Sequence, residues 1–163
     1  MITARLIGDD RVIARLERMR PAIMDRVQKA LSRLLFDLQR HVMEDKLSGQ
    51  VLNVGAKGPH LRDSIRVAGP KSDGASFIGS VGTNMVYAGI HEYGGRTPAH
   101  IIAPKNKKAL AFEIGGETII RRLVHHPGSQ MPERSFLRSA LRDMQGQIQD
   151  GIGAAVAEGL KNA

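Results

Sequence analysis

The 163-residue chain contains no cysteine and no tryptophan, and only 4% of its residues are aromatic. Without cysteine, neither a disulfide framework nor a thiolate zinc site can form. Scarce aromatics argue against a stacking platform for single-stranded nucleic acid, which uses several exposed rings. No stretch approaches the roughly 20 apolar residues that span a bilayer, and the first ten residues lack the apolar core of a secretory signal. These absences favour a protein that is made and assembled in a cytoplasm.

The chain is strongly basic, with a formal net charge of +8 and a sequence pI of about 10.3. Such a balance favours contact with something acidic, such as nucleic acid, an anionic membrane or an acidic protein. The basic residues are spread along the chain, and no block of five or more like charges occurs. The charge therefore indicates a diffuse positive field and not a base-reading surface.

Apolar residues spaced three and four apart predict a long helix over residues 21–47. Pro21 suits the first turn of this helix, and Ser48-Gly49 is a plausible end. A short, separate amphipathic segment with Val12, Ile13, Leu16 and Met19 precedes it. The stripe of the long helix comprises Ile23, Val27, Ala30, Leu34, Leu38 and Val42.

The middle of the chain predicts loops and hairpins. Residues 48–60 and 94–108 are rich in glycine, proline and lysine without an apolar period, so we expect loops there. Residues 61–82 predict a hairpin whose first strand is Leu61 to Val67, and residues 109–114 and 118–124 predict a second hairpin around Gly115-Gly116. A final helix should begin at Pro132-Glu133 and run to Leu160. The chain is thus predicted to be α+β, a single domain over residues 1–163 in which the long N-terminal helix and the C-terminal helix pack on a small antiparallel sheet.

The sequence carries no specific catalytic signature. No serine lies in a G-x-S-x-G elbow, and neither a phosphate-binding loop nor a dinucleotide fingerprint is present. No two histidines lie four apart on a helix, and His125 and His126 would point to opposite faces of a strand. We therefore predict no catalytic residue, no metal ligand and no cofactor, and expect that the protein is not an enzyme.

The segment Val81 to Gly95 places two small residues, Ala88 and Gly89, between Tyr87 and Ile90. Small residues let another segment approach the backbone closely. Tyr87 and Tyr93, the only tyrosines, each combine an apolar body with a polar tip. Composition alone favours an ordinary short helix or turn that covers the sheet, with a contact surface as the alternative.

Three motifs in this part of the chain resemble a known family. They are GTNMVYAGIHEYGG, then IIAPKNKKALAF, then LVHHPGSQMPERSFLRSAL, preceded by the strand-like LRDSIRV. Their order and spacing over about residues 60–142 resemble phage tail-completion or neck (head–tail joining) proteins, which include Mu-like virion morphogenesis proteins and lambdoid minor tail components. The matching positions are Tyr87, Ala88, His91, Glu92 and Gly94; Lys105, Lys108, Ala109, Leu110 and Phe112; and His126, Pro127, Gly128, Pro132, Arg134, Phe136 and Leu137.

This resemblance implies a structural virion protein that completes the tail end and helps join tail to head as a subunit of a ring, with six-fold symmetry expected. It implies partners among further copies of the chain, the tail tube or terminator, and the head–tail connector. DNA passing through the lumen is a further candidate partner, and no membrane is implied. The expected location is the virion, after assembly in the host cytoplasm.

Two other readings of the chain remain open. One is a basic protein that binds DNA without sequence preference, and the other is a small cell-wall hydrolase, for which no carboxylate pair or metal site is evident. On the tail-protein reading, we expect the following residues at a subunit or partner interface: Tyr87, His91, Glu92, Tyr93, Lys105, Lys107, Lys108 and Arg134.

Overall fold

The computed structural model describes residues 9–48, 61–74 and 76–161. The chain divides into two compact units, where the sequence predicted a single domain. Unit 1 combines the chain up to Met85 with the chain from Phe136 onward, and unit 2 is Val86–Ser135. The predicted loop at 48–60 lies outside the described residues, except for Ser48 in a turn. No helix in the described ranges is both long and apolar enough to cross a membrane.

Unit 1 is built along one long helix, α1, which spans Asp9–His41 and continues as a π-helical turn, Val42–Lys46. The predicted helix over 21–47 is confirmed, but the predicted break before it is wrong because α1 runs straight through Pro21. Proline removes one helical hydrogen bond and leaves a carbonyl without its partner. The carbonyl left without a partner is that of Glu17. Glu17 and Pro21 are both exposed, so water can bond to this carbonyl.

A β-hairpin and two short helical segments pack along α1. The hairpin joins β1 (Arg66–Ser72) to β2 (Phe77–Gly82) in antiparallel pairing, and both strands contact α1. The predicted strand over Leu61 to Val67 is wrong in its first half, where Arg62–Ser64 form a 3-10 turn. In an extended strand Asp63 would share a face with Leu61 and Ile65. In the turn Leu61 and Ile65 are fully buried while Asp63 stays exposed, which explains why the turn replaces extended chain.

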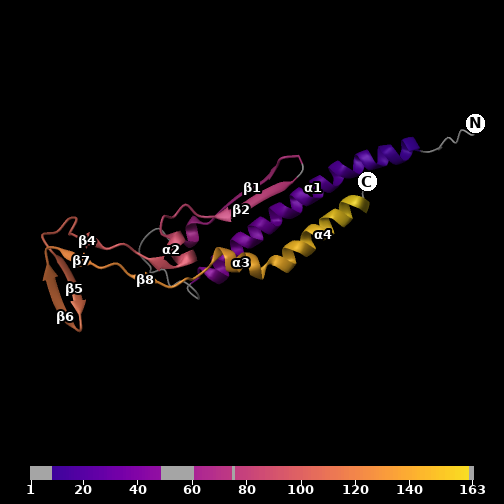
Figure 1. Cartoon of the computed structure of the whole chain (residues 1–163). Coiled ribbons are helices and arrows are strands. Elements are labelled where there is room, and N and C mark those ends of the chain that lie inside the picture. The colour runs from indigo at the N-terminus through magenta and orange to yellow at the C-terminus, as the bar shows by residue number, and fades with distance from the viewer. Residues whose placement is uncertain (1–8, 49–60, 75, 162–163) are drawn as a thin grey trace, which may run out of the picture. The chain divides into compact units, whose positions relative to one another are not determined.

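The C-terminal helix predicted from Pro132 begins later and is divided in two. Helix α3 spans Leu137–Asp143 and α4 spans Gln145–Lys161, with a turn at Met144. Figure 1 shows α4 running alongside α1, which it contacts over most of its length. Gly159 makes the closest approach, because a side chain there would lie 2.6 Å from the Cα atom of Ile23. The predicted α+β class, with a long N-terminal helix, a C-terminal helix and small antiparallel sheets, is confirmed.

The core of unit 1 lies where α1, the 3-10 turn, the hairpin and α3 meet. Its fully buried large side chains are Phe136, Leu61, Ile65 and Val42. Burying a side chain of this size contributes roughly 1.5–3 kcal/mol. Leu34 and Leu35 of α1 and Met144 between the last two helices extend the same core.

Unit 2 consists of the short helix α2 (Ala88–Tyr93) and a series of nested strand pairs. Strand β3 (Gly95–Arg96) pairs with β8 (Gln130–Met131), and β4 (His100–Ile102) pairs with β7 (Val124–His126). Strand β5 (Leu110–Ile114) pairs with β6 (Glu117–Arg121) across the two-residue turn Gly115-Gly116. Residues 95–131 thus form one interrupted two-stranded ribbon, here called the β-arm, which Figure 1 shows from β8 out to the β5–β6 turn.

The β-arm corrects two expectations. The second hairpin is confirmed as β5–β6, but Val124 belongs to β7, which pairs with β4. The predicted loop at 94–108 contains the short strands β3 and β4. After β4, residues 103–108 lack regular structure. Strands this short carry no clear alternation, so periodicity could not reveal them.

Candidate assembly surface

At the start of the β-arm, α2 and residues 132–135 are joined by hydrogen bonds; this part is here called the root. The backbone N–H of Arg134 donates to the carbonyl of His91 at 2.8 Å, and the Ser135 hydroxyl donates to a carboxylate oxygen of Glu92 at 2.8 Å. These bonds hold residues 132–135 in extended form beside α2. They explain why the last helix begins at Leu137 and not at Pro132.

One step further out, Thr97 and Ser129 fasten the two sides of the β-arm. The Thr97 N–H donates to the Ser129 carbonyl at 2.9 Å, and the Ser129 N–H donates to the Thr97 hydroxyl at 2.7 Å. Gly128 lies against this clasp with φ of +84°, and a side chain there would come within 2.2 Å of the Thr97 carbonyl oxygen. Only glycine fits at that position, so the clasp depends on it.

The histidines of the β-arm serve its own pairing. His100 and His126 are directly opposed in the β4–β7 register, and their rings stack with centroids 4.9 Å apart. His126 also accepts a hydrogen bond from the Gly128 N–H at 3.0 Å, whereas the neighbouring His125 is exposed. Within the described ranges, no three histidine, aspartate or glutamate side chains converge into a group suited to a metal ion.

His91 lies in an unusual environment at the root. Its Nδ1 is buried and has no hydrogen-bond partner among the described residues, and its ring meets the Tyr87 ring edge-on at 6.0 Å. Burial, and secondarily the positive charge of Arg134, lower the pKa of His91 below its ordinary value of 6.5. The imidazole is therefore neutral at physiological pH.

The β-arm has no core of its own. No residue from 93 to 135 is buried, and all of these residues lie in the described part of the chain. Its exposed apolar side chains include Ile114 (60%) and Ile120 (63%), together with Ile101, Ile102 and Leu123. The β5–β6 hairpin packs mainly on itself. A two-stranded ribbon of this kind is at best marginally stable alone in water, so the exposed faces of the β-arm are a candidate contact surface.

The structure places the eight predicted interface residues in two groups. Tyr87, His91, Glu92, Tyr93 and Arg134 come together at the root, where Tyr93 and Arg134 are exposed. Lys105, Lys107 and Lys108 lie on the exposed bend that leads into β5.

Glu92 is the exception among these residues. Its side chain is only 4% exposed and accepts the Ser135 hydroxyl, so it braces the root and is not available to a partner. It was expected at an interface on the tail-protein reading, as one of the matching motif positions. Sequence reasoning also missed the exposed apolar residues of the β-arm. Their signal was weak, because Ile114 and Ile120 sit in strands that look half-buried by alternation.

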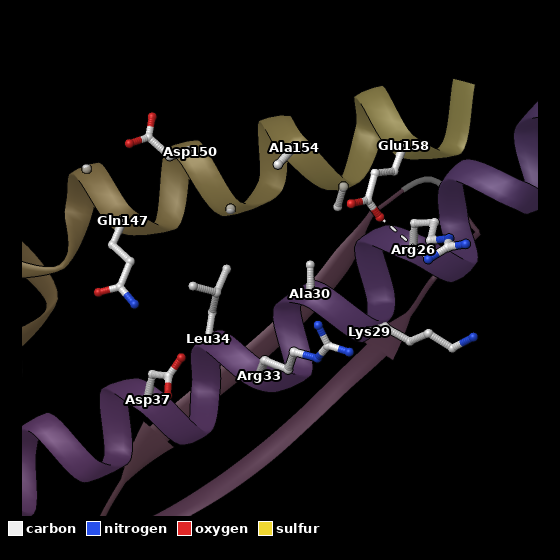
Figure 2. A pocket seen from close by; sticks show the side chains of 13 residues that line it. Arg26, Lys29, Ala30, Arg33, Leu34, Asp37, Gln147, Asp150, Ala154 and Glu158 are labelled. Atoms are coloured by element: carbon white, nitrogen blue, oxygen red, sulfur yellow. Dashed lines mark hydrogen bonds and ion pairs between the residues drawn. The ribbon is translucent and has the colours of Figure 1, made fainter. Parts of the chain in front are cut away.

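Apart from the β-arm, a concave surface lies in unit 1, between α1 and α4. This groove of about 740 Å³ has a cationic wall on α1 formed by Arg26, Lys29 and Arg33, and small residues such as Gly151 and Ala154 on α4. Figure 2 shows Arg26 joined across it to Glu158, an ion pair at 3.5 Å. Lys29 pairs with Asp25 at 2.8 Å. The charges on both walls are thus partly compensated within the chain, and the groove is a crease between two packed helices.

Comparisons of the chain with protein-family models, with curated proteins and with solved structures returned no match.

Proposed function

We propose that this protein is a structural subunit of a phage-type tail, which completes the tail end and helps join tail to head as a member of a ring, and that it has no enzymatic activity. Two lines support the proposal. The three ordered motifs between residues 81 and 142 resemble tail-completion and neck proteins. Independently, the β-arm exposes a series of apolar side chains that a single copy leaves uncovered.

The observation that carries the proposal is the contrast between a hydrogen-bonded root and an arm whose apolar side chains are uncovered. The hydrogen bonds from Arg134 and Ser135 to α2 fix the direction in which the arm leaves the root. A fixed arm without a core is suited to reaching a neighbouring subunit, because contact there covers its apolar residues. A catalytic protein would instead be expected to converge polar groups in a pocket.

The test is a mass measurement of the purified protein, alone and mixed with tail tubes from its own particle, followed by imaging of the tube ends. We expect a ring, with a mass near six subunits, at one end of the tube. A protein that stays monomeric in both conditions and leaves the tube ends bare would overturn the proposal.

The alternative is a basic protein that binds DNA without sequence preference. It is favoured by a monomer that binds duplex DNA with an affinity that falls steeply as salt rises. A reproducible hydrolysis of peptidoglycan or nucleotide, abolished by a single substitution, would instead show that the protein is an enzyme.

A further inference from the structure

The two ends of the β5–β6 hairpin carry opposite charge. Glu113 and Glu117 flank the Gly115-Gly116 turn and form the acidic tip. The opposite end, around the Leu110–Arg121 pair, is the basic base, formed by Lys107, Lys108, Arg121 and Arg122. All six charged side chains are exposed, and none makes an ion pair within the described part of the chain.

A hairpin cannot neutralise its own base with its own tip. Along the hairpin, Glu117 lies four residue steps and Glu113 three steps from the Leu110–Arg121 pair, which corresponds to about 14 Å and about 10 Å at about 3.4 Å per residue. At physiological ionic strength, charges more than about 8 Å apart are largely screened. Neither end therefore neutralises the other, and both ends remain available to a complementary surface on another molecule.

We propose that the acidic tip of one copy docks on the basic base of the next copy. The chain itself supplies the matching charge, and Ile114 beside the tip and Leu123 beside the base are exposed apolar residues that the contact would cover. A nucleic acid duplex lying along the hairpin would meet the acidic tip as well as the basic base. A protein surface that carries both signs avoids that repulsion, so a second copy is favoured over DNA.

This contact joins two different patches, so it is heterologous and closes into a ring when the rotation between copies permits. The inference rests on the proposed function and names the surfaces through which the ring would form. It adds that these surfaces are polar, so association should weaken as salt rises.

Because the chain has no cysteine, introduced cysteines test the contact directly. In the double variant Glu117→Cys/Arg122→Cys, the two thiols are too far apart within one hairpin to pair, since a disulfide needs Cα atoms within about 7 Å. We expect mild oxidation to produce a ladder of covalent oligomers on a denaturing gel. The matched control Glu44→Cys/Arg122→Cys keeps the base cysteine and moves the other to the exposed surface of unit 1, and it should give no ladder.

Charge reversal provides a second test. Glu113→Lys/Glu117→Lys reverses the tip, and substitution of all four base residues by glutamate reverses the base. Each variant alone should lose the oligomer in light scattering at low salt, and an equal mixture of the two should regain it, because each reversed end then meets a complementary one. Glu44→Lys/Asp150→Lys makes the same change in net charge as the tip variant on unit 1, and it should associate as the unmodified chain does.

Several results would overturn the inference. These are equal ladders from the double variant and its control, normal association of both charge-reversed proteins, or loss of DNA binding as the only effect of base reversal. Oligomers that show the cross-link but never attach to tail tubes would refute the proposed function and leave the contact in place. Normal tail completion by the tip-reversed variant would refute the contact between tip and base and leave the proposed function in place.

Discussion

The two units of this protein differ in whether they have a buried core, although both leave several large apolar side chains exposed. Unit 1 buries Phe136 completely at the start of its last helical segments, whereas the β-arm leaves Ile120 63% exposed. Unit 1 is therefore held by a hydrophobic core, whereas the β-arm relies on backbone pairing and on the clasp at Thr97 and Ser129. The comparison assigns the buried residues to the stability of unit 1 and leaves the exposed residues of the β-arm as candidates for a role in the proposed assembly.

The largest expected effect comes from comparing two phenylalanines. Phe136→Ala should lower the free energy of unfolding by about 3–5 kcal/mol, because it removes a fully buried ring. Phe112→Ala, in the half-buried position of β5, should leave the unfolding of unit 1 nearly unchanged. Denaturant unfolding monitored by far-ultraviolet circular dichroism measures both. Equal losses would mean that the β-arm and unit 1 unfold as one cooperative structure.

The next effect contrasts two glycines of α4. Gly159→Ala should destabilise unit 1 by about 1–3 kcal/mol, because the new Cβ would lie 2.6 Å from the backbone of Ile23. Gly153→Ala meets open space and should stabilise the helix by up to about 1 kcal/mol. Thermal melting of the two variants gives the sign of each change. A stabilising Gly159→Ala would contradict the close approach of α4 to α1.

Arg134 tests the division between stability and assembly at the root. Its side chain is exposed, and the root uses its backbone N–H, which alanine retains. Arg134→Ala should therefore leave the melting temperature of the subunit nearly unchanged and still reduce the yield of complete particles. The melting curve and a count of finished particles are the two measurements. A variant that unfolds the subunit would place Arg134 with Phe136 as a residue of the fold.

The smallest effect concerns pH at the root. The pKa of His91 is lowered in the folded protein, so the unfolded chain binds more protons as the pH falls from about 6.5. The contribution of neutral His91 to the free energy of unfolding should therefore be complete above about pH 6.5. It should be lost as the pH falls through the pKa of His91 in the folded protein. Nuclear magnetic resonance titration of the His91 ring gives that pKa. Arg134→Ala should raise the pKa of His91 but leave it below 6.5, because burial is the larger cause of the shift. An unchanged pKa would show that Arg134 does not act on the ring.

The sequence predicted those parts of the fold that rest on local periodicity. The stripe from Ile23 to Val42 predicted the long helix, and the Gly115-Gly116 pair predicted the β5–β6 turn. Periodicity failed where contacts distant in sequence determine the local structure. Residues 132–135 stay outside the helix because they bond to α2, and residues 62–64 form a turn that keeps Asp63 exposed while Leu61 and Ile65 enter the core.

The candidate surface was predicted less completely than the fold. Arg134 and the three lysines are exposed, as a contact with a partner would require, whereas Glu92 is buried, and the interface itself stays a prediction. No pattern in the sequence indicated that β3 pairs with β8 or β4 with β7, since pairing between strands this short depends on the turn that brings them together. The polarity of the β5–β6 hairpin became visible only once the strand register had placed its charges at opposite ends.

The nested pairing of the β-arm also has a consequence for the order of folding. The β5–β6 turn needs only neighbouring residues to form, and each later pair then closes a short additional loop. Such zipping from the turn toward the root is fast, because every step is local once the previous one is complete. When the root closes, Met85 and Phe136 are joined by a structured connection instead of a floppy one. The two halves of unit 1, distant in sequence, then meet at a lower entropic cost, so pairing within the arm favours the native topology of its own chain.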